Sequence, residues 1–171
     1  MTPPEISLES PVKEKIAWAE RLYAERGGRL RMDPVVADLL ERFRNAAEAS
    51  HREMGRSGIA EACMRCARYE GGSCCGKGLE DRYSGLLLLV NLLLDRPLPR
   101  ERLDPRGCFF LGEDGCLLLA RHVICVNYLC TRITQPMEPA RIRPLRDREG
   151  EELDLLFLLT EKVKALLRGM E

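Results

Sequence analysis

Apolar residues recur every three or four positions in several stretches of the chain, which is the spacing of one face of an α-helix. This spacing predicts helices at about 11–26, 34–54, 84–95 and 149–168. A Ser-Pro pair and an Asp-Pro pair are typical starts for the first two helices, and Gly27-Gly28 is expected to end the first. Because the linker between them is short, the N-terminal helices, about 11–54, are expected to pair as an antiparallel hairpin.

The remaining segments carry other patterns. Residues 63–78 contain glycine, cysteine and charge without periodicity, so no helix is expected there. Two apolar runs flank a Gly-Glu-Asp-Gly turn, which predicts a small hairpin within 108–119. One or two helical turns are expected over 121–130, and the prolines and arginines of 137–149 favour an extended connection. The chain is therefore predicted to be all-α or α-dominated, with at most one short β-hairpin.

Size and composition narrow the function classes. At 171 residues and 45% hydrophobic, the chain suits a single domain spanning 1–171. Basic and acidic residues both number 27 and aromatics make up only 5%, so no nucleic-acid partner is expected. The longest apolar run, 86–94, is about half the ~20 residues that a membrane span needs, so no membrane partner is expected either. The polar N-terminus does not resemble a secretory signal, which favours a cytoplasmic location.

Eight cysteines are many for a chain with this much ordinary core, and in a reducing compartment clustered cysteines are more often ligands than disulfides. The candidate metal ligands are Cys63, Cys66, Cys74, Cys75, Cys108, Cys116, Cys125 and Cys130. Cys63 and Cys66 form a C-x-x-C, a spacing at which a tight turn brings two thiolates to one ion. Soft thiolate sets select zinc or an iron-sulfur cluster, and the choice between these two cofactors stays open.

Cys74 and Cys75 are adjacent, and consecutive side chains project in different directions. They indicate either two nearby centres or one centre with a spare thiol. Nearby basic residues could balance the negative charge of such centres, or simply be solvated. These residues are Arg65, Arg68, Lys77, Arg106, Arg121 and Arg132. Cys125 and Cys130 lie in an apolar segment, so a purely structural role as buried small residues is the alternative for them.

A phosphate-binding loop is a second interpretation of part of this region, since Gly71–Lys77 matches G-x-x-x-x-G-K. Such a loop needs a buried strand before it and a Ser or Thr after the lysine. Gly78 occupies the hydroxyl position, and the preceding residues do not form a strand pattern. The metal interpretation is therefore favoured.

The order of the eight cysteines resembles the CxxCxxCC (YkgJ-type) family, whose members are described as zinc- or iron-chelating domains. The resemblance covers 63–130 and rests on CMRC, the Cys74-Cys75 pair, GCFFL, GCLLL and RHVIC, with Cys130 last. The spacing between Cys66 and Cys74, and His122 after Arg121, depart from the family pattern and leave the cysteine pairing open. The resemblance implies a cysteine-cluster metal-binding core at 63–130, flanked by the N-terminal helix pair and a C-terminal helix at about 149–168. One branch of the family is similar to flagellin lysine N-methylase, which implies methyl transfer as a further activity.

Two kinds of function follow. The first is a metal-binding protein that uses clustered thiolates to hold an iron-sulfur cluster or zinc in a structural or electron-transfer role. The alternative is an enzyme, either a methyltransferase of the flagellin lysine N-methylase kind or an iron-sulfur oxidoreductase. His122 lies between Cys116 and Cys125 and is the candidate for an extra ligand or acid-base group, whereas His51 is assigned to the solvent-facing side of its helix. The sequence identifies no protein partner.

Overall fold

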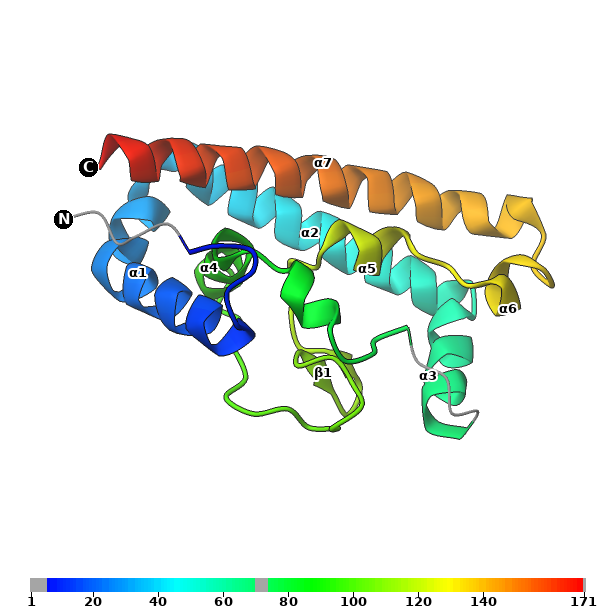
Figure 1. Cartoon of the computed structure of the whole chain (residues 1–171). Helices are drawn as coiled ribbons and strands as arrows, with labels where there is room; N and C mark the ends of the chain where they lie inside the picture. The colour runs from blue at the N-terminus through cyan, green and yellow to red at the C-terminus, as the bar shows by residue number, and fades with distance from the viewer. Residues whose placement is uncertain (1–5, 70–73, 171) are drawn as a thin grey trace.

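The computed structural model describes residues 6–69 and 74–170, and it confirms an α-dominated fold with one small hairpin (Figure 1). Its helices and strands are α1 (Val12–Met32), α2 (Pro34–Arg56), α3 (Ile59–Tyr69), the 3-10 helix η1 (Leu79–Arg82), α4 (Gly85–Leu93), β1 (Leu111–Gly112), β2 (Gly115–Cys116), α5 (Val123–Asn127), α6 (Thr131–Thr134) and α7 (Pro139–Gly169). The long helices α2 and α7 run antiparallel along the molecule and share the most extensive helix contact (Figure 1). α1 and α4 pack together toward one end, and α3 and α6 lie at the other.

Buried apolar side chains form two separate cores. The main core lies between α1, α2, α4 and the C-terminal half of α7, and includes fully buried residues such as Phe43, Leu88 and Leu159. The segment around the hairpin joins it through Phe110. A smaller satellite core has three buried members, Ile59, Ile133 and Leu145, which come from α3, α6 and the first part of α7. The elements that carry the cysteines therefore pack against two different cores.

Several predicted elements are confirmed. α2 and α4 match the predicted helices at about 34–54 and 84–95 closely. Ser84 caps α4, accepting a hydrogen bond from the Leu87 amide at 3.1 Å. β1 and β2 form the predicted antiparallel hairpin, with Leu111 opposite Cys116. α5 accounts for the helical turns expected over 121–130, and α6 follows directly after that stretch.

The predicted end of the first helix at Gly27-Gly28 was wrong, because α1 continues through both glycines to Met32. Burial of Leu30 and the bonds of Arg31 offset the low helix propensity of glycine. The Arg31 guanidinium donates to the Leu92 carbonyl at 3.0 Å and pairs with Asp95 at 2.6 Å. The expected linker is therefore helical, and α1 packs mainly on α4 rather than as a hairpin with α2.

The prediction that residues 63–78 contain no helix was also wrong for its first part, since Cys63 and Cys66 lie on α3. Gly58, at φ 80°, makes the turn that precedes this helix. Ile59 then anchors α3 in the satellite core, where its buried partners Ile133 and Leu145 are distant in sequence. Residues 70–73 lie outside the described residues, and with them much of the G-x-x-x-x-G-K match.

The extended connection expected at 137–149 is instead the beginning of α7, which starts at Pro139. A proline suits the first helical turn, but Pro144 lies inside the helix, where it removes a backbone hydrogen bond. Tertiary contacts compensate for this loss. Leu145 is fully buried in the satellite core, and Arg146 donates to the Asn127 carbonyl at 2.8 Å.

Candidate metal centre

The C-x-x-C motif lies on a helix rather than in the tight turn that its spacing predicted. Cys63 and Cys66 lie three residues apart on α3, so their side chains share one face of the helix. Cys74 follows shortly after α3, and Cys130 directly precedes α6. The fold thus brings thiols from three separate segments to the same end of the molecule.

These four thiols form one group, which we call the outer set: Cys63, Cys66, Cys74 and Cys130. Burial raises the pKa of Cys63, and the neighbouring thiols of Cys74, Cys130 and Cys66 raise it further. The pKa of Cys74 is also raised, first by burial and then by Cys130 and Cys66, and its side chain is hydrogen-bonded with Cys130. The Arg132 guanidinium donates to the Cys66 sulfur at 3.5 Å.

The other four thiols form an inner set: Cys75, Cys108, Cys116 and Cys125. The Cys108 amide donates to the Cys75 carbonyl at 2.7 Å, and Gly76 and Gly107 form an antiparallel bridge beside them. Burial raises the pKa of Cys108 to about 11. Cys75 also reaches about 11, first through burial and then through the thiols of Cys116 and Cys125.

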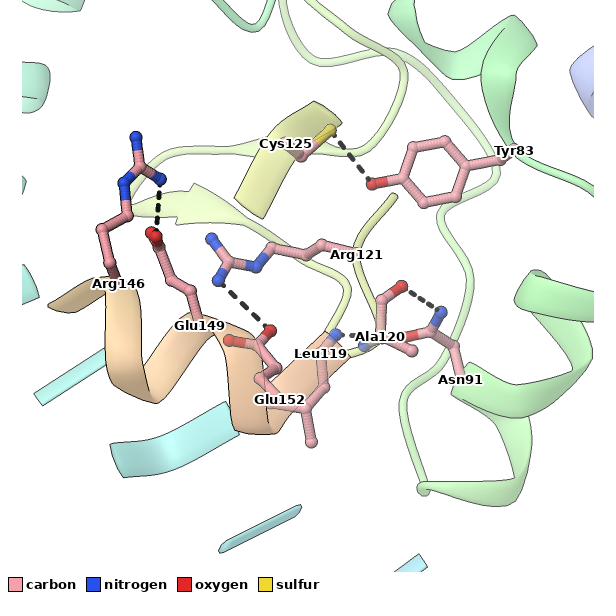
Figure 2. A network of polar contacts seen from close by, with 9 residues as sticks. All are labelled: Tyr83, Asn91, Leu119, Ala120, Arg121, Cys125, Arg146, Glu149 and Glu152. Atoms are coloured by element: carbon pink, nitrogen blue, oxygen red, sulfur yellow. Dashed lines mark hydrogen bonds and ion pairs between the residues drawn. The ribbon is translucent and has the colours of Figure 1, made fainter. Parts of the chain in front are cut away.

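Cys116 and Cys125 complete the inner set beside two polar side chains. Although Cys116 is exposed as a residue on the hairpin, burial of its thiol raises the pKa to about 11, and the Arg121 charge opposes that rise. The Tyr83 hydroxyl donates to the Cys125 sulfur at 3.6 Å (Figure 2). Tyr83 is 1% exposed, so this donor is held inside the protein.

Cys74 and Cys75 are thus adjacent in sequence but have their principal thiol neighbours in different sets. Among thiols, Cys130 and Cys66 raise the pKa of Cys74, whereas Cys116 and Cys125 have the largest effects on the pKa of Cys75. Cys75 is also influenced more weakly by Cys74 and Cys63, so the two sets adjoin at this pair. All eight cysteines lie within the described residues, and no disulfide joins them.

The donor chemistry of both sets suits a soft ion, although the sets are not closed around a point. Within residues 6–69 and 74–170, no three His, Cys, Asp or Glu side chains are disposed so that they could hold a metal ion as they stand. The raised pKa values mean that the thiols stay protonated without a bound ion, since burial and the neighbouring thiols both disfavour a negative charge on sulfur. A bound cation offsets these negative charges, so the thiols that coordinate it lose their protons.

A network of buried charges fixes the segment that carries Cys125 (Figure 2). The Arg121 guanidinium lies 3.4 Å from a Glu152 carboxylate oxygen, and Arg146 lies 2.6 Å from Glu149. Glu149 and Glu152 are 2% and 0% exposed, and burial raises the pKa of both carboxyls. Arg146 and both glutamates belong to α7, so the link to the segment of Cys125 is made by Arg121, paired with Glu152, and by Arg146, which donates to the Asn127 carbonyl of α5 at 2.8 Å.

Two further polar residues form hydrogen bonds to the backbone of the segments that carry the inner set. Asn91 on α4 bonds to the backbone of residues 119 and 120, just before Arg121 (Figure 2). Glu80 accepts from the Phe109 amide at 3.4 Å and is ion-paired with Arg102. Arg102 also donates to the Gly107 carbonyl, so the pair braces both sides of Cys108.

Sequence reasoning missed the roles of Glu149 and Glu152, yet a signal was present. Residues 149, 152, 156, 159 and 163 all share one face of α7, and the last three are buried apolar residues. Carboxylates within such a stripe indicate buried partners. Asn91, alone within an apolar run, gave the same kind of signal for α4.

The two histidines have local surroundings that differ. His122 caps α5, its Nδ1 accepting from the Ile124 amide at 3.2 Å, and its ring lies 5.9 Å from that of Tyr83. Burial and the Arg82 charge lower the pKa of His122. His51 on α2 is exposed as a residue, but partial burial of its ring and the charges of Arg121 and Arg96 lower its pKa to about 4, so the ring is not simply in solvent as predicted. Among the basic residues proposed to balance charge, Arg132 donates to a thiol and Arg121 acts on Cys116 through its charge, whereas Arg106 is 91% exposed and pairs with Asp104.

Comparisons with protein-family models, with curated proteins and with solved structures find no match to this chain. Across the described residues, no helix combines the length and the apolar character that crossing a bilayer requires. The chemistry of the thiol sets is therefore the basis for a functional proposal.

Proposed function

We propose that this protein binds soft metal at two adjacent four-cysteine centres, each holding zinc or an iron-sulfur cluster in a structural or electron-transfer role. The single observation that supports the proposal is the division of the eight cysteines into an outer and an inner set of four each. Four thiolates are the complete ligand set of a closed tetrahedral zinc site or of a cubane iron-sulfur cluster. The resemblance to the CxxCxxCC family agrees with this chemistry.

The residues around the thiols fit metal binding in two further ways. Arg132 at the outer set and Arg121 at the inner set bring positive charge to thiolate groups that would otherwise be negative overall. Tyr83 supplies a hydrogen-bond donor to Cys125, the kind of neighbour that orients a sulfur ligand. Closing either set around an ion needs movement of the side chains, since the present spacing does not yet hold one.

Metal content is the decisive measurement. Protein purified without oxygen is expected to contain either about two zinc ions per chain and no visible colour, or iron and sulfide with broad visible absorbance. Elemental analysis and an absorption spectrum distinguish these outcomes. A chain that holds no metal, both as purified and after reconstitution with zinc or with iron and sulfide, would overturn the proposal.

Serine variants test whether the cysteines are the ligands. Cys66→Ser removes one donor from the outer set, so the bound metal is expected to fall by about half. Met64→Ser is the matched control, because Met64 is exposed on the same helix and supplies no thiol to either set. Equal metal content in both variants would mean that the outer set does not bind metal.

An enzymatic role is the alternative, as a methyltransferase of the flagellin lysine N-methylase kind or as an iron-sulfur oxidoreductase. A cavity of about 810 Å³ lies between α2 and α7, with Asn45, Arg148 and Asp154 among its lining residues. None of the eight cysteines lines it. Metal binding by the thiols is thus the function that the grouping and donor chemistry of the cysteines support best.

A further inference from the structure

The two thiol sets differ in how firmly the fold holds them. The inner set belongs to the main core: Cys108 is a buried member, and Cys75 and Cys125 pack against it. Backbone hydrogen bonds fix its segments, among them Cys108 to Cys75 at 2.7 Å and Lys77 to Arg106 at 2.9 Å. The Glu80–Arg102 ion pair, in which Glu80 is 3% exposed, braces the same loop.

The outer set rests on much less buried structure. Of its members, Cys130 packs against the satellite core, which has three buried members among the described residues. Cys63 and Cys74 are exposed. α6 is a four-residue helix, and α3 makes its principal helix contact with the end of α2. Arg132, which donates to Cys66, is itself exposed.

This asymmetry has a consequence for the exchange of a bound ion. A thiolate-bound metal leaves a protein when an incoming ligand reaches it and replaces the protein sulfurs one at a time, which needs access or local opening. Local opening costs less free energy where few apolar contacts are buried, and more where a segment belongs to the main core. Cys63 and Cys74 provide access to the outer set. In the inner set Cys116 is exposed as a residue, but Cys108 is buried and Cys75 and Cys125 pack against the main core, so releasing an ion from all four sulfurs requires the main core to open.

We propose that the outer set is an exchange site, from which a soft metal ion passes to a thiol-bearing or chelating acceptor while the inner set retains its own ion. This inference rests on the proposed function. The transfer involves no change in oxidation state. The ion keeps its charge, each acceptor thiol gives up a proton as it binds, and each released cysteine takes up a proton in return. The outer set would thus handle metal, and the inner set would hold the fold around it.

The test is the release of zinc from the full-length chain reconstituted with zinc, measured with a chromogenic zinc chelator in excess. Two phases are expected, each with about one ion per chain, the fast phase at least about tenfold faster than the slow one. Pulse alkylation with mass spectrometry identifies which cysteines lose protection in each phase. Cys63, Cys66, Cys74 and Cys130 are expected to react in the fast phase, and Cys75, Cys108, Cys116 and Cys125 in the slow phase.

The possible results separate the two proposals. Release of two ions in a single phase, or alkylation of the inner cysteines first, would overturn the exchange site while leaving metal binding intact. Retention of no zinc at all would overturn the exchange site, whereas the proposed function would be overturned only if the chain also failed to hold iron and sulfide. The Cys66→Ser variant adds an independent check, because it is expected to lose the fast phase and keep the slow one. Met64→Ser is expected to keep both.

Discussion

Asn91 lies fully buried on α4 and uses both ends of its amide to join two parts of the fold. Its Nδ2 donates to the carbonyls of Leu87 and Ala120 at 3.0 and 2.9 Å. Its Oδ1 accepts from the amides of Leu119 and Ala120, both at 3.0 Å. One side chain therefore satisfies backbone groups of a segment that would otherwise be buried without partners, and that segment leads to Arg121 and the inner set.

We predict that Asn91→Ala lowers the free energy of unfolding by roughly 2–4 kcal/mol, because it leaves several buried backbone groups without hydrogen bonds. Urea unfolding followed by circular dichroism measures the change. Asn45→Ala is the matched control, since Asn45 is exposed on α2, and it is expected to have little effect. Similar losses in the two variants would mean that the buried amide does not hold the segment.

Glu80 is the second residue with a large local role, and its effect depends on pH. Burial alone would raise its pKa, but the bond to Arg102 and the backbone amides outweigh burial, so the pKa lies below the ordinary value of 4.5. A carboxyl with a lowered pKa stabilises the folded state above its unfolded-state pKa. That contribution is lost as the pH falls through the folded-state value.

The Glu80→Gln variant is therefore expected to be less stable than the wild type by about 1–3 kcal/mol at neutral pH. The difference should narrow as the pH falls below about 4.5, where the carboxyl of the unfolded chain is protonated first, and disappear once the pH is below the lowered folded-state pKa. Denaturant unfolding at several pH values checks this, with Glu151→Gln, an exposed partner of Arg148, as the control. A gap that stays constant with pH would show that the ionised carboxylate is not responsible.

At the scale of elements, α1 is a helix that continues through two glycines that would ordinarily end it. Both Gly27 and Gly28 lie inside the helix, but their surroundings differ. A Cβ at Gly27 would lie 2.7 Å from the ring of Tyr23, whereas one at Gly28 would meet nothing within 4 Å. Gly27 is thus explained by close packing, and Gly28 is not explained by any contact.

This contrast gives a paired prediction. Gly28→Ala is expected to raise the free energy of unfolding by about 0.5–1 kcal/mol, because alanine has the higher helix propensity and fits without contact. Gly27→Ala is expected to gain less or to destabilise, since the Tyr23 ring must move. Thermal unfolding of the two variants side by side measures the difference. A larger gain at Gly27 would contradict the packing around Tyr23.

The elements also show which parts of the site could be read from the sequence. α2 and α4 were predicted because long apolar stripes and capping residues act locally. α3 and the first turns of α7 were missed, because their buried residues find partners far away in sequence. Ile59 and Leu145 pack together in the satellite core, and no local sequence pattern predicts that contact.

At the scale of the whole molecule, the long pair α2 and α7 carries both cores and thereby sets the places of both thiol sets (Figure 1). The main core supports the inner set through Cys75, Cys108 and Cys125. The satellite core supports the outer set through Cys130. Unequal support of two neighbouring sites is the physical basis for expecting unequal metal exchange.

The sequence by itself determined that the chain is α-dominated and that its eight cysteines, in a fixed order, are the candidate metal ligands. Periodicity and residue chemistry are local properties, so they can be read without knowing the fold. Only the tertiary structure decided that Cys74 joins Cys63, Cys66 and Cys130, while Cys75 joins the inner set. That division depends on where helices pack and which charges are buried between them, and these are contacts between residues distant along the chain.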